Sequence, residues 1–127
     1  MKAGMVAAAV LGVLASGGVS ASADDGNELL TYCKQAVEPP DTRRMDKAPN
    51  DLRIGQCFGI MEGVKSTLMI MEQSPKGGRV ACWPVEGINN LQAAQIVVTY
   101  LNNHPGQLNK NRVLLTILAF SDAYPCQ

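Results

Sequence analysis

The residues best suited to chemistry in this sequence are four cysteines: Cys33, Cys57, Cys82 and Cys126. An even number of cysteines in an oxidising compartment is typical of disulfides. Zinc is the alternative, but structural zinc sites in short chains usually contain close pairs such as Cys-x2-Cys. Here the nearest cysteines are 24 positions apart and the chain has a single histidine. We therefore predict two disulfides and no metal site.

Catalytic chemistry has little support. A Cys/His nucleophile pair needs a free thiol, which the disulfides would remove. His104 is predicted to end a helix beside a proline, where an imidazolium stabilises the last carbonyls. Glu62, Glu72 and Glu86 fall on polar helix faces or in loops and form no pair, and no nucleophile elbow or phosphate loop is present. We expect no enzyme activity and no cofactor.

Composition excludes further classes. The 127 residues contain 11 Lys and Arg against 11 Asp and Glu, so the charge that nucleic acids or anionic membranes attract is missing. With 46% hydrophobic and 17% charged residues, the chain is too apolar for disorder. These features favour recognition of a protein partner by local shape.

Residues 1–23 have the organisation of a signal peptide. Lys2 precedes an apolar stretch over residues 3–14, and Ala21-Ser22-Ala23 is typical of a cleavage site. Glycines and serines interrupt this stretch, which argues against a transmembrane anchor. We expect a mature domain over residues 24–127, exported to a bacterial periplasm and outside the membrane.

Hydrophobic periodicity predicts a small all-α, four-helix domain. The first helix covers residues 27–37, with Asn27 as its cap, and the second covers residues 52–72. Between them, the charged segment 41–51 is interpreted as a surface loop. Asn89 or Asn90 caps the third helix, which ends before Pro105.

Asn109 is the expected cap of the last helix. The short connection around Pro105 predicts that the last two helices form an antiparallel hairpin. The open end of that hairpin would bring Cys82 near Cys126, so we prefer the pairs Cys82–Cys126 and Cys33–Cys57. Pairing Cys57 with Cys82, and Cys33 with Cys126, stays open.

Gly55, Gly59 and Gly63 recur at every fourth position of the second helix. Each glycine costs a helix about 1 kcal/mol relative to alanine, so the repeat needs a reason. We expect another backbone to approach closely, and prefer a helix of the same chain over a second subunit. Trp83, the only tryptophan, is interpreted as a lid over the core, with an exposed interface anchor as the alternative.

The sequence resembles the Rap/Tai immunity proteins of type VI secretion. The resemblance spans nearly the whole mature chain and rests on the order of five short segments: Gly26-Asn27-Glu28-Leu29-Leu30 with Cys33, Cys57-Phe58-Gly59-Ile60-Met61-Glu62-Gly63, Cys82-Trp83-Pro84, Tyr100-Leu101-Asn102-Asn103-His104-Pro105, and Tyr124-Pro125-Cys126. Tyr124 stands where phenylalanine is commoner, and Trp83 where an aliphatic residue is usual.

The resemblance implies a helical periplasmic protein, often a homodimer, that blocks a secreted peptidoglycan amidase without catalysis of its own. We expect the partner-binding residues in the polar turn between the last two helices: Asn102, Asn103, His104, Gln107 and Asn109. Two alternatives stay open. One is an orphan member of the same fold with a housekeeping binding role, and the other is a small acid-stress chaperone, for which one histidine and few charges are a poor basis.

Overall fold

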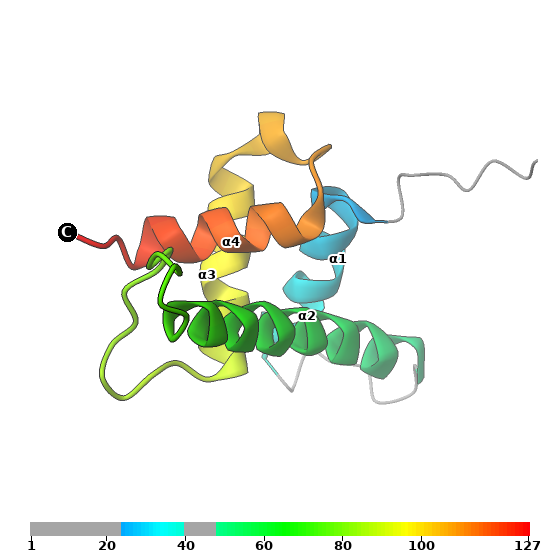
Figure 1. Ribbon diagram of the computed structural model, residues 1–127. Helices are drawn as coiled ribbons and strands as arrows, with labels where there is room; N and C mark the ends of the chain where they lie inside the picture. Colours follow the sequence, from blue (N-terminus) through cyan, green and yellow to red (C-terminus); the bar gives the residue numbers. More distant parts are fainter. Residues whose placement is uncertain (1–23, 40–47) are drawn as a thin grey trace, which may run out of the picture.

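The computed structural model describes residues 24–39 and 48–127. Within these ranges the chain is helical, and its only pairing of β type is an isolated bridge between Asp25 and Asn111. The helices are α1 (Gly26–Val37), α2 (Ala48–Glu72), α3 (Asn90–Asn103), the 3-10 helix η2 (Pro105–Gln107) and α4 (Arg112–Ala123) (Figure 1). The predicted all-α, four-helix class is confirmed. The predicted signal peptide, residues 1–23, lies outside the described residues.

The beginning of α1 is set by Asp25 and not by Asn27. The Asp25 carboxylate accepts hydrogen bonds from the backbone N–H groups of Asn27 and Glu28 at 3.0 and 3.1 Å. The Glu28 N–H also lowers the pKa of this carboxyl, because it stabilises the charged form. The second helix begins at Ala48, earlier than predicted, so part of the expected charged loop is helical.

Asparagines begin the last two helices. Asn89 forms a capping box with Gln92, in which each side chain bonds the backbone N–H of the other residue, at 2.8 and 2.9 Å. Asn111, and not Asn109 as expected, caps α4 by accepting two first-turn N–H groups at 2.9 and 3.2 Å. Asn109 lies before the cap, within the connection.

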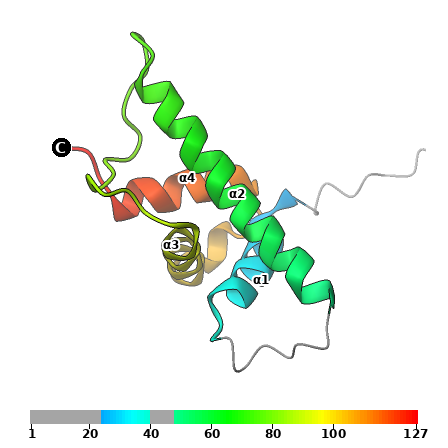
Figure 2. The ribbon, with the colours of Figure 1, turned by 90° about the horizontal axis from the view of Figure 1, so that it is seen from below.

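The helices form two crossed layers. Figure 1 shows α1 and α3 side by side with opposite chain directions, and α2 and α4 lying across them. In Figure 2 α3 is seen end-on while α4 lies in the plane, so the last two helices cross steeply and do not form the expected antiparallel hairpin. The connection between them explains the difference. Its Leu108 and Lys110 carbonyls accept hydrogen bonds from Asn27 and Gly26, which fixes the start of α4 to α1.

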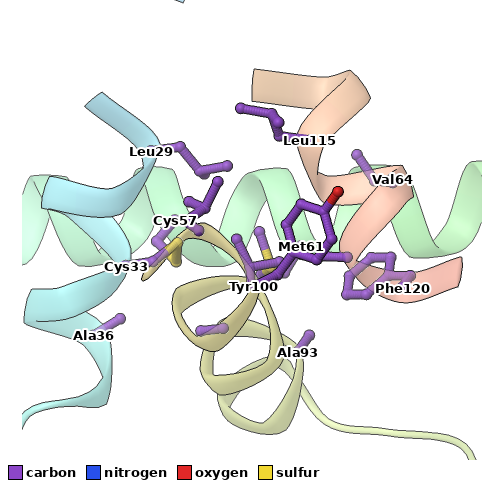
Figure 3. Close-up of a cluster of buried hydrophobic side chains, with 14 of the residues drawn as sticks. Leu29, Cys33, Ala36, Cys57, Met61, Val64, Ala93, Tyr100, Leu115 and Phe120 are labelled. Atoms are coloured by element: carbon purple, nitrogen blue, oxygen red, sulfur yellow. A yellow bond between two sulfur atoms is a disulfide. The ribbon is translucent and has the colours of Figure 1, made fainter. Parts of the chain in front are cut away.

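The core lies where the two layers cross (Figure 3). Its largest fully buried side chains come from all four helices: Leu29 and Cys33 of α1, Cys57 and Met61 of α2, Val97 and Leu101 of α3, and Leu115, Thr116 and Phe120 of α4. The polar atom among them is satisfied, because the Thr116 hydroxyl donates to the Arg112 carbonyl at 2.9 Å. The buried faces of the four helices therefore meet in a single core.

Both preferred disulfides are confirmed. Cys33–Cys57 links α1 to α2 with both cysteines fully buried, and Cys82–Cys126 links the connection 73–89 to the C-terminal tail. Beside the second bridge, the Cys82 N–H donates to the Tyr124 carbonyl at 2.8 Å. The predicted hairpin of the last two helices, from which the Cys82–Cys126 pair follows, does not form. Cys82 reaches Cys126 because its own connection runs past the end of α4.

A buried lysine holds the connection 73–89 from the other side. The Lys65 ammonium of α2 donates to the Ile88 carbonyl and the Asn90 side chain, both at 3.1 Å, and pairs with Glu62 at 3.1 Å. The hydrogen bond from the Lys65 ammonium to the Glu62 carboxylate is the main reason that the pKa of Glu62 is lowered. Lys65 therefore fixes the start of α3 against α2.

The two bridges should differ in their effect on stability. Removing either bridge opens a closed loop of chain and should lower the free energy of unfolding by about 2–5 kcal/mol. We expect the double variant C33A/C57A to lose more free energy of unfolding than C82A/C126A, although its loop is shorter, because it also opens a cavity in the core. Chemical denaturation with circular dichroism measures both. Equal losses would show that the buried sulfurs add nothing beyond chain entropy.

Lys65→Met should separate packing from hydrogen bonding at the α2–α3 contact. Methionine keeps the length of the lysine stem but leaves the Ile88 carbonyl and the Asn90 side chain without their donor. We expect the free energy of unfolding to fall by about 1–3 kcal/mol. The exposed Lys76, changed to methionine in the same way, is the control and should change stability by less than about 0.5 kcal/mol. A matching loss in both variants would contradict this role for Lys65.

Candidate functional site

The predicted turn is a surface feature held rigidly at its centre by His104. Asn102, Asn103 and Asn109 are exposed, while His104 and Gln107 are half-buried. The Nδ1–H of His104 donates to the Tyr100 carbonyl at 2.7 Å, and the two rings stack with centroids 4.0 Å apart. The expectation that this histidine binds a terminal helix carbonyl is confirmed.

Backbone contacts tie the same turn to the rest of the fold. Gln107 and Lys110 each donate to a carbonyl three residues earlier, at 3.0 and 2.9 Å, and the Asn27 side chain donates to the Leu108 carbonyl at 3.2 Å. Gly26 packs so closely here that an added Cβ would lie 3.0 Å from the Leu108 oxygen and 2.4 Å from the end of Leu115. The turn is therefore presented to solvent from a fixed backbone.

A polar groove adjoins the turn, between α3 and α4. It has a volume of about 480 Å³ and shares Asn103 and His104 with the turn. The α3 wall carries Gln92, Gln95 and Thr99 as well, and the remaining lining residues are Ile96, Tyr100, Ala119, Asp122, Ala123 and Tyr124. Of its lining residues, only Asn103 and His104 belong to the predicted site. The available signal was the repeat of uncharged polar side chains along one face of α3.

A second groove, between α2 and α4, is apolar. Its volume is about 380 Å³, and its lining residues are Ile60, Gly63, Val64, Thr67, Leu68, Met71, Arg112, Val113 and Ile117. Met71 and Val113 leave nearly half of their surface exposed, at 48% and 43%. The two grooves therefore offer different chemistry on α4, one rich in hydrogen-bonding groups and the other in hydrocarbon.

An ion cluster adjoins the apolar groove, because Arg112 belongs to both. Arg112 pairs with Asp24 at 2.8 Å and lies 3.8 Å from Glu28. Glu28 also accepts a hydrogen bond from the Tyr32 hydroxyl, and this bond is the main reason that the pKa of Tyr32 is raised. The cluster joins the start of α1 to α4, and its two carboxylates share the single guanidinium of Arg112.

The glycines of α2 have no close neighbour among the described residues. A Cβ built on Gly55, Gly59 or Gly63 would meet no other part of the described chain within 4 Å. The preferred expectation, contact with another helix of the same chain, therefore does not hold, because these positions lie on the solvent side of α2 while Cys57, Met61 and the other buried positions face the core. A second subunit remains the other reading.

Trp83 covers the end of the core, as the lid interpretation expected. Its ring meets Phe120 edge-on at a centroid distance of 5.1 Å and lies 5.7 Å from the ring of Tyr124. The side chain is partly buried, beside the Cys82–Cys126 bridge. Its contacts are therefore with the chain's own core.

The described residues show neither a metal-ligand cluster nor a membrane-spanning helix. They contain no group of three or more His, Cys, Asp or Glu side chains placed to hold a metal ion. None of the helices in these ranges has both the length and the apolar character needed to cross a membrane.

The chain matches one known protein family over most of its length. A family model described as Rap1a immunity proteins matches residues 25–126. The chain belongs to the Rap1a immunity protein family. No curated protein and no solved structure gives a significant match. Membership in the Rap1a family confirms the resemblance seen in the sequence.

The family assignment indicates the general role. As a Rap1a family member, the chain is an immunity protein, whose partner is a secreted effector protein. The family suggests that this role is that of a non-catalytic inhibitor. Together with the two disulfides, membership in the Rap1a family indicates an extracytoplasmic protein.

The glycines of this Rap1a family member allow a direct test. Measured on the monomer at low protein concentration, Gly59→Ala should raise the free energy of unfolding by about 0.5–1 kcal/mol, because alanine favours the helix and its methyl group meets open space in the described chain. Gly77→Ala is the contrasting variant and should destabilise, since its Cβ would lie 1.7 Å from the Met71 carbonyl oxygen. Thermal unfolding measures both. A loss of stability in Gly59→Ala would reveal a close contact at α2.

Proposed function

We propose that this chain is a periplasmic immunity protein that binds a type VI secreted peptidoglycan amidase and occludes its active site. The observation that carries the proposal is the family match over residues 25–126. The rigid polar turn between α3 and α4 supports it, because a protruding segment with a fixed backbone suits insertion into an enzyme cleft. The proposal includes export through residues 1–23.

Occlusion of this kind needs no chemistry from the immunity protein. Asn102, Asn103 and Asn109 would enter the substrate groove of the effector and exclude the peptidoglycan stem peptide, while His104 and Gln107 keep the turn in shape. A stable interface buries about 800 Å² on each partner, which is more than one turn supplies. The polar groove between α3 and α4 is continuous with the turn and would provide the remaining contact area.

We also propose that the chain forms a homodimer through the α2 side of the molecule. The apolar groove, with the exposed Met71 and Val113 at its rim, offers hydrocarbon that water disfavours. Gly63 lines this groove, and Gly55 and Gly59 continue the exposed side of α2 without side chains. This would give the glycine repeat a function, because a second subunit could approach the α2 backbone closely.

The decisive experiment measures inhibition of an amidase. Purified chain is added to the amidase effector encoded nearest to its gene, and release of stem peptides from peptidoglycan is followed. We expect stoichiometric inhibition by the wild type. Asn102→Arg should weaken inhibition at least about tenfold, because a long charged side chain prevents close contact in the centre of an interface.

Gln73→Arg is the matched control, since Gln73 is exposed in the connection 73–89 and lies outside both grooves. It should inhibit like the wild type. If the wild type neither binds nor inhibits any amidase effector, the amidase assignment is wrong. Equal inhibition by Asn102→Arg and Gln73→Arg would remove the turn from the interface.

A further inference from the structure

We infer that the polar groove between α3 and α4 binds an arginine side chain of the effector, with Asp122 as its ionic partner. The inference rests on the proposed function and adds to it a second contact, beside the turn, with its own chemistry. Asn103 and His104 line both the turn and the groove, so a partner that covers the turn also reaches Asp122.

The groove carries a carboxylate that no lysine or arginine of its lining neutralises. Its lining residues include the Asp122 carboxylate but no lysine or arginine. Asp122 is exposed and, among the described residues, no hydrogen bond or ion pair involves its carboxylate. By contrast, the acidic groups of the α1–α4 ion cluster share Arg112.

The end of α4 adds to the negative potential. α4 ends at this groove, at Ala123, and has no basic residue in its last turn, whereas the groove runs along the whole of α3, from Gln92 in its first turn to Asn103 in its last. The C-terminal end of a helix carries about half a negative charge. Asp122 lies in the last turn of α4, where a carboxylate is itself disfavoured, so a cation from a partner would relieve an unfavourable arrangement.

Arginine fits this lining better than other cations. Its planar guanidinium presents five N–H donors and stacks on aromatic rings. The groove supplies the amide oxygens of Gln95 and Asn103 as acceptors and the ring of Tyr124 as a stacking surface. An acidic segment would meet repulsion at Asp122, and an apolar segment would strip water from these polar groups without replacing their hydrogen bonds.

Charge reversal at Asp122 tests the inference. The probe is the amidase effector that the wild-type chain inhibits. We expect Asp122→Asn to weaken binding about tenfold and Asp122→Arg about a hundredfold or more, measured by calorimetry. Glu86→Arg is the matched control, because it changes the net charge equally at an exposed residue outside the groove. Its affinity should stay within about threefold of the wild type.

A charge swap then distinguishes direct pairing from a general disturbance. Each surface arginine of the effector is changed to glutamate, and one such variant should recover binding to Asp122→Arg at least about tenfold while binding the wild type poorly. Size-exclusion chromatography with light scattering is run on every variant. A change of oligomeric state in Asp122→Arg would show that a second copy of this chain occupies the groove and would overturn the inference.

The outcomes distinguish a failure of the proposed function from a failure of the arginine contact. If the wild type binds no amidase effector, the proposed function fails. If the wild type binds but Asp122→Arg binds within about threefold of it, the proposed function stands and the arginine contact is wrong. The absence of any rescuing effector variant would likewise exclude a direct pair with Asp122.

Discussion

The buried Cys33–Cys57 bridge is the constraint on which the rest of the structure depends. A domain of about a hundred residues buries too little surface for a large margin of stability, so a covalent link contributes a substantial share. This bridge lies inside the core and fixes α1 against α2. The α1–α2 pair then provides the apolar surface that α3 and α4 cover.

The contacts around this pair keep the functional surface rigid. The start of α1 holds the connection between α3 and α4 through backbone hydrogen bonds, and Lys65 holds the start of α3 against α2. The Cys82–Cys126 bridge and the Trp83 ring close the end of α4. A surface prepared in this way loses little conformational entropy when a partner binds, which is the property that an inhibitor of a secreted effector needs.

Sequence reasoning succeeded where the information is local. Periodicity located all four helices, and the proline after His104 correctly indicated the end of α3. It failed where several nearby residues compete for one role. In the structure Asp25 caps α1 in place of the predicted Asn27, and Asn111 caps α4 in place of Asn109. Tertiary contacts with the connection decide which of these residues has the backbone conformation of a cap. Spacing alone does not say which neighbour a glycine repeat meets, and the repeat of α2 meets none within 4 Å among the described residues.

The sequence by itself determined the class of this protein: a charge-balanced, all-α chain with two disulfides and the motif order of the Rap1a family. These properties depend on composition, residue spacing and periodicity, which can be read directly from the amino-acid sequence. Only the tertiary structure decided the steep crossing of α3 and α4, and with it the polar groove that contains Asp122. A groove forms between residues far apart in the chain, so its shape and charge depend on how the helices pack.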